Sequence, residues 1–137
     1  ARPCLADKWI DSVFAAAAEQ GAAVLATPVN STLKRVDGQH QIQETVDRQG
    51  LWEAQTPQVF SREILLKAYA AREGKQATDD AMLVESLGEP IVIVKGSPLN
   101  LKITTRDDLR LAEQVLKVLP KPKGKVGNPF ADDDLWR

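Results

Sequence analysis

Hydrophobic residues near the start of the chain are spaced first as in a helix and then as in a strand. Four apolar side chains recur on one helical face: Trp9, Ile10, Val13 and Phe14. This spacing predicts a helix over residues 7–20, which Gly21 ends. The continuously apolar residues 22–27 then predict a strand that Pro28 closes. A helix followed by such a strand is typical of a parallel sheet buried on both faces.

A polar segment interrupts this alternation. Residues 32–46 carry Asp37-Gly38 between two weakly alternating runs, which predicts a hairpin with a tight turn. The hairpin has too few apolar side chains to form a core, and such hairpins need another surface to be stable. We therefore predict a projecting β-hairpin arm over residues 32–46, with a turn over residues 47–50 at its base.

The second half of the chain returns to alternating helices and extended segments. The pattern predicts extended segments over 51–60 and 101–104, a strand over 91–94, and helices over 61–73, 79–87 and 106–119, the last two capped by Thr78 and Thr105. This order predicts the α/β class with an open, mostly parallel sheet. The run Gln55-Thr56-Pro57-Gln58 fits an extended edge segment, where proline is tolerated.

The two ends of the chain differ from its middle. Residues 120–137 are basic and then acidic, with Pro and Gly between the charges, so we predict a flexible tail there. Residues 1–119 are then expected to form part of one domain. The opening Ala1-Arg2-Pro3-Cys4 has no start-like character, and we expect it to lie inside a larger domain.

Composition excludes several classes of function. A formal net charge of −1 gives no general attraction to nucleic acid or to an anionic membrane. No apolar run approaches the roughly 18 residues that span a bilayer. Cys4 is the only cysteine, which excludes an internal disulfide and suits a reducing compartment. One cysteine and the single His40 cannot supply the roughly four ligands of a structural zinc site, so we expect no metal ligands in this chain.

Three cations are candidates for a binding site because each lies at the end of a strand or in a loop: Arg2, Arg48 and Lys102. In open α/β sheets, ligands bind beyond the carboxyl ends of the strands, where such cations can meet phosphates. Any one of them could equally be a solvated surface charge, so the assignment depends on the surrounding motifs.

Those motifs follow one another in a specific order. They are Asp47-Arg48, Leu51-Trp52 with Gln55-Thr56-Pro57-Gln58, Thr78-Asp79-Asp80, and Asn100-Leu101-Lys102-Ile103-Thr104. In order and spacing they resemble the C-terminal half of the 2-C-methyl-D-erythritol 4-phosphate cytidylyltransferases, from Ala1 to about Glu113. The resemblance implies a partial, Rossmann-like nucleotidyltransferase sheet.

The resemblance also implies roles for five residues. Arg2, of Ala-Arg-Pro, matches an active-site arginine of the family, and Arg48 and Lys102 match residues that bind the acceptor phosphate. Thr32 and Thr78 match substrate-binding threonines. The arm is expected to join a homodimer and to carry Arg48 and Thr32 to the neighbouring subunit's site.

The implied reaction transfers a cytidylyl group from CTP to 2-C-methyl-D-erythritol 4-phosphate. It yields 4-diphosphocytidyl-2-C-methyl-D-erythritol and pyrophosphate, in non-mevalonate isoprenoid synthesis. Two anions must meet, so catalysis depends on positioning and charge neutralisation rather than on a protein nucleophile. The resemblance further implies Mg²⁺, whose main ligand would lie upstream of Ala1, and a bacterial cytoplasmic location, with the plastid stroma as an alternative.

Two other functions stay open. A ribitol-5-phosphate cytidylyltransferase would share the same motifs, and the chain could instead be a non-catalytic dimerisation fragment. Two departures from the family pattern bear on this choice. Ser31 stands where the family commonly has Asp, and no glycine-rich loop for the CTP triphosphate occurs among eight scattered glycines. We therefore expect the 137-residue chain alone to be inactive.

Overall fold

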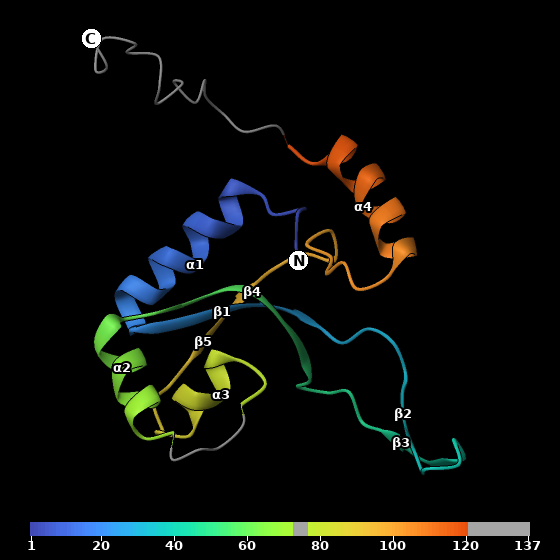
Figure 1. Ribbon diagram of the computed structural model, residues 1–137, viewed down its shortest axis with the longest axis horizontal. Coiled ribbons are helices and arrows are strands. Elements are labelled where there is room, and N and C mark those ends of the chain that lie inside the picture. Colours follow the sequence, from blue (N-terminus) through green and yellow to red (C-terminus); the bar gives the residue numbers. More distant parts are fainter. Residues whose placement is uncertain (73–76, 121–137) are drawn as a thin grey trace, which may run out of the picture.

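The computed structural model describes residues 1–72 and 77–120. In chain order its elements are α1 (Asp7–Gln20), β1 (Ala22–Pro28), β2 (Leu33–Val36), β3 (Ile42–Val46), β4 (Trp52–Phe60), α2 (Arg62–Ala70), α3 (Asp80–Glu85), β5 (Val92–Lys95) and α4 (Arg106–Val118) (Figure 1). Residues 101–104 contain no regular strand. The flexible tail predicted over residues 120–137 lies, apart from Pro120, outside the described residues.

The body of the protein is built on a three-stranded sheet in the order β4-β1-β5. β5 lies parallel to β1, with Ala23 opposite Val92, whereas β4 runs antiparallel on the other side. The α/β class and the partial sheet are confirmed, and parallel pairing accounts for one of the two interfaces between the described strands of this sheet. The β1–β4 register shifts between Val24 and Ala26. As the central strand, β1 is buried from Ala22 to Thr27.

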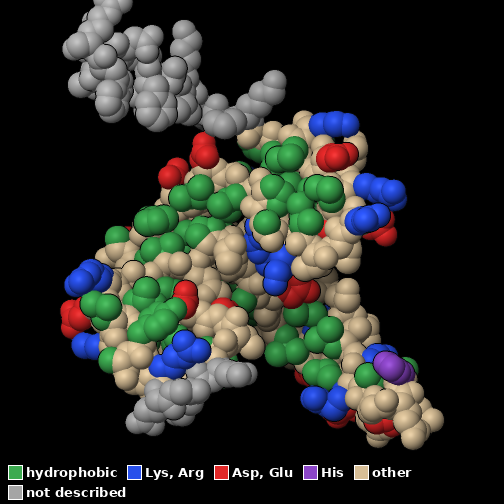
Figure 2. Space-filling model, in the orientation of Figure 1, with side chains coloured by type: hydrophobic (Ala, Val, Ile, Leu, Met, Phe, Trp, Pro, Cys, Tyr) green, Lys and Arg blue, Asp and Glu red, His purple; other side chains and the backbone are tan. Residues whose placement is uncertain are grey.

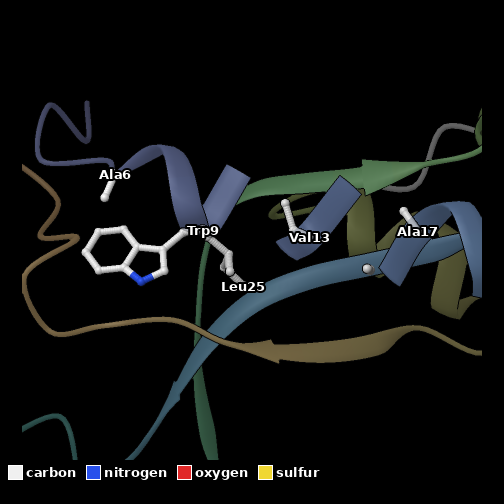
Figure 3. Packing of buried hydrophobic residues seen from close by; sticks show 6 residues of the cluster. Ala6, Trp9, Val13, Ala17 and Leu25 are labelled. Atoms are coloured by element: carbon white, nitrogen blue, oxygen red, sulfur yellow. The ribbon is translucent and has the colours of Figure 1, made fainter. Parts of the chain in front are cut away.

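Helices cover both faces of β1. On one face, Trp9, Val13 and Ala17 of α1 pack against Leu25 (Figure 3). On the other face, Ala22 packs with residues of α2 and α3. This two-sided burial explains the continuously apolar sequence of the strand.

One residue of the predicted apolar face of α1 is exposed. Phe14 is 56% exposed, whereas Trp9, Val13 and Ala17 are buried. These three follow one another at intervals of four residues and so form a single stripe. Phe14 lies about 100° further round the helix from Val13. The prediction that Phe14 belongs to the packed face was therefore wrong.

The predicted arm is a separate two-stranded sheet of β2 and β3 that projects from the body (Figure 1). The predicted tight turn lies within a longer loop: the His40 N–H donates to the Asp37 carbonyl at 3.1 Å, which forms a β-turn, and the Asp37 N–H donates to the Gln41 carbonyl at 3.1 Å, which closes the loop over residues 37–41. The Asp37 carboxylate accepts from the Gln41 and Gln39 N–H groups, and these bonds lower its pKa. The left-handed residue of the loop is His40, with φ of 60°.

Helix caps were predicted with mixed success. Thr105 caps α4 as predicted, and it forms a reciprocal capping box with Asp108. Thr78 was wrongly assigned as the cap of α3, because Asp79 holds that position and accepts from the Met82 N–H at 3.0 Å.

Among the described residues, no helix is long and apolar enough to cross a membrane.

The capping box of α4 predicts a specific dependence of stability on pH. Hydrogen bonds from the backbone and hydroxyl of Thr104 and from Thr105 lower the pKa of Asp108 from 3.8 to about 2. The folded state therefore favours the charged form, and the stabilisation is complete above about pH 4 and is lost as pH falls through about 2. Asp108→Asn cannot ionise, so its melting temperature should fall below wild type at about pH 6, and the gap should close near pH 2. Circular dichroism measures the melting temperatures of both proteins. A difference in melting temperature that stays constant from pH 6 to pH 2 would contradict the prediction.

Candidate active site

A cavity of about 400 Å³ lies at the carboxyl end of β1. Its walls come from the N-terminal segment, the residues after β1, β4, and the loop after β5, which spans residues 96–102. Two cations line it, Arg2 and Lys102, together with the carboxylate of Glu53. Figure 2 shows Lys and Arg side chains gathered in the hollow between α4 and the rest of the molecule, with acidic side chains beside them. Positive charge thus exceeds negative charge on the wall of this cavity.

The guanidinium of Arg2 is held in place by backbone carbonyls. Its Nη1 donates to the carbonyl of Asn100, and its Nη2 donates to that of Ala54 at 3.3 Å. The N–H of Ile103 donates to the Ala1 carbonyl at 2.8 Å, which fixes the N-terminal segment beside the 96–102 loop. Burial lowers the pKa of Arg2, and the charge of Glu53 opposes that shift. Arginine has five N–H donors, so three remain for a ligand.

Lys102 completes a pair of different cations. It lies exposed in the same loop and lines the cavity together with Arg2. The planar guanidinium of an arginine and the mobile ammonium of a lysine together suit the several oxygens of a phosphate group better than either group alone. The structure therefore brings together two of the three predicted cations although 100 positions separate them in the sequence.

Arg48 and Thr32 lie at the base of the arm, next to this cavity but outside its wall. Arg48 Nη1 donates to the carbonyl of Asn30, which lines the cavity. Thr32 is exposed and follows Ser31, which also lines the cavity. The substrate roles of Arg48 and Thr32 stay predictions.

Thr78 is not brought to the cavity of Arg2. It is exposed, and its Oγ1 lies 3.8 Å from the Met82 sulfur. Its neighbour Asp79 lines a second cavity, of about 310 Å³, with Val24 and Ala26. Those two residues alternate along β1 with the ones that face α1, so the second cavity lies on the opposite face of the sheet.

Two residues of the first cavity were missed as parts of the site. Gln55 and Asn100 are buried polar side chains that line it. Gln55 was interpreted as part of an extended edge segment; β4 is an edge strand of the described sheet, but Gln55 is the one buried residue of that strand. A glutamine within an otherwise extended segment and an asparagine just before Lys102 were the available signals, but neither spacing shows that the two side chains meet.

Acidic side chains are sparse at the cavity. Among the described residues, no three His, Cys, Asp or Glu side chains gather as metal ligands, and Glu53 is the one carboxylate on the wall of the cavity.

The chain has the fold of a solved family of enzymes. The fold is that of the cytidylyltransferases: it superimposes with a TM-score of 0.78 on 2-C-methyl-D-erythritol 4-phosphate cytidylyltransferase from Thermus thermophilus, which is 40% identical. The match covers 86% of this chain and 59% of that one. The family model described as IspD, 2-C-methyl-D-erythritol 4-phosphate cytidylyltransferase, matches residues 1–118. The chain belongs to this family of nucleotidyltransferases, as its motifs predicted.

Relatives named 2-C-methyl-D-erythritol 4-phosphate cytidylyltransferase share about half of their aligned residues with the chain. The protein from Rhodopirellula baltica is 51% identical over 116 residues, which are 85% of this chain and 47% of the relative. That from Syntrophus aciditrophicus is 46% identical over 127 residues, or 91% of this chain and 53% of the relative. The chain thus spans about half the length of these relatives.

Proposed function

We propose that the whole protein, meaning a polypeptide of the relatives' length that contains this chain, transfers a cytidylyl group from CTP to 2-C-methyl-D-erythritol 4-phosphate. The cavity that joins Arg2 to Lys102, in a chain of this family, is the observation that supports the proposal most directly. The products are 4-diphosphocytidyl-2-C-methyl-D-erythritol and pyrophosphate.

The reaction requires two anions to approach each other. A phosphate oxygen of the acceptor attacks the α-phosphorus of CTP, a new P–O bond forms, and the bond to the leaving pyrophosphate breaks. Arg2 and Lys102 neutralise the acceptor phosphate and hold it in line for attack. The transferred phosphorus is already activated by its pyrophosphate leaving group, so no protein nucleophile is needed.

The partner we propose for the arm is a second copy of the chain. The arm projects from the body (Figure 1), and its cross-strand pair Val36 and Ile42 is 46% and 64% exposed. A homodimer would cover this apolar pair and the open hairpin edges. In that arrangement Arg48 and Thr32 extend the acceptor site of the other subunit.

The bacterial relatives and the single cysteine support a cytoplasmic location.

The proposed acceptor can be tested against the rival acceptor. The whole protein, supplied with CTP and Mg²⁺, is expected to use 2-C-methyl-D-erythritol 4-phosphate with a kcat/KM about 100-fold above that for ribitol 5-phosphate. Phosphorus NMR detects the diphosphate product and the released pyrophosphate. The reverse preference would establish the ribitol enzyme. The 137-residue chain, assayed beside the whole protein, is expected to show no turnover, because its sequence contains no glycine-rich motif for a triphosphate.

A further inference from the structure

Two buried amide side chains tie β4 to the loop that carries Lys102. Gln55 is 5% exposed and Asn100 is fully buried. The Asn100 Nδ2 donates to Gln55 Oε1 at 3.2 Å and to the Thr56 carbonyl at 2.9 Å. The Gln55 Nε2 donates to the Ser97 carbonyl at 2.9 Å. We call this set of three hydrogen bonds the amide clamp.

The amide clamp leaves no room for a side chain at Gly96. A Cβ at that position would lie 2.3 Å from Gln55 Oε1, far inside van der Waals contact. The N–H of Gly96 also donates to the Ala26 carbonyl at 2.8 Å, so the backbone there cannot easily move away. A side chain at residue 96 would therefore push the Gln55 amide out of its present position.

Arg2 is attached to the same clamp. Its Nη1 donates to the backbone carbonyl of Asn100, the residue whose side chain Gln55 holds. Asn100 stays buried although its Oδ1 accepts no hydrogen bond from any described residue, which costs stability. An apolar residue of similar size would avoid that cost but would lose both donor bonds of Nδ2 and free the loop.

We propose that Gln55 is a positioning residue, which acts through Asn100 to hold the 96–102 loop so that Arg2 and Lys102 face one cavity. The inference rests on the proposed function, in which these two cations bind the acceptor phosphate. The clamp sets their separation, and a displacement of about 1 Å at a reacting group can cost on the order of 100-fold in rate.

The test compares Gln55→Ala, Gly96→Ala and the double variant in the whole protein. Each single variant is expected to raise the KM for the acceptor about tenfold or more, with the KM for CTP changed by less than about twofold. Both changes disturb one contact, so the double variant should be no worse than Gln55→Ala alone. Lowered melting temperatures with an unchanged KM for the acceptor would overturn the proposal. If Gln55→Ala fails to fold, Gly96→Ala gives the same decision.

A second measurement does not depend on turnover. The N–H groups of Asn100 and Ile103 donate to the carbonyls of Ser97 and Ala1, so hydrogen exchange at both reports loop order. Gln55→Ala should speed their exchange by about tenfold or more. Gln58→Ala is the matched control, because Gln58 lies on the same strand but donates to Asp79 at 2.8 Å, and it should leave both rates unchanged.

The two measurements separate the clamp from the reaction. Unchanged exchange at Asn100 and Ile103 in Gln55→Ala would refute the proposed role of Gln55, whether or not the whole protein makes the cytidylyl product. Faster exchange in Gln55→Ala, together with a wild-type protein that makes no cytidylyl product, would support the clamp and refute the proposed function.

Discussion

Lys102→Ala in the whole protein is expected to lower kcat/KM for the acceptor by about 10²–10³. Lys102 supplies the mobile charge of the cavity, since Arg2 already donates to the carbonyls of Asn100 and Ala54. Loss of the ammonium leaves an attacking phosphate only partly neutralised. Steady-state rates at limiting acceptor and saturating CTP measure the effect.

The matched control for this variant is Lys117→Ala. Lys117 is also an exposed lysine, but it lies on α4, where its Nζ donates to Gln114 at 2.9 Å. It should retain wild-type rates, because Lys117 does not line the cavity and exposed charges are screened by salt. If Lys102→Ala behaved like Lys117→Ala at limiting acceptor, the phosphate site would have to lie elsewhere.

The order of helices and strands could be predicted because burial follows from local pattern. β1 lies between helices on both faces, and its uninterrupted apolar run shows this directly. The predictions failed where a side chain competes with the pattern. Asp37 uses its carboxylate to organise a longer loop than Asp-Gly suggests, and Asp79 rather than Thr78 caps α3. In both cases a nearby side-chain carboxylate accepts hydrogen bonds from backbone N–H groups. The spacing of hydrophobic residues carries no information about which side chain does so.

The candidate site was less predictable than the fold. Arg2 and Lys102 were singled out by motif, but only the packing of the N-terminal segment against the 96–102 loop brings them together. Gln55 and Asn100 were missed because their importance lies in a contact between residues 45 positions apart. A buried amide pair has no periodicity and no fixed spacing, so a single sequence does not distinguish it from two solvated amides.

Mixing two inactive variants is expected to restore activity if the acceptor site is shared between subunits. We propose that Lys102 acts within its own subunit, whereas Arg48, at the base of the projecting arm, acts in the site of its partner. In a heterodimer of Arg48→Ala and Lys102→Ala subunits, one site then regains both cations and the other loses both. Random exchange of equal amounts should therefore recover about one quarter of wild-type turnover.

The control for this experiment mixes Lys102→Ala with a subunit that carries both substitutions. No site in that heterodimer has both Arg48 and Lys102, so turnover should stay at the background of the separate variants. Native mass spectrometry confirms in each case that heterodimers have formed. Heterodimers of the two single variants that remain inactive would rule out the shared site. Arg48 would then act within its own subunit, where its guanidinium already donates to Asn30 at the edge of the cavity.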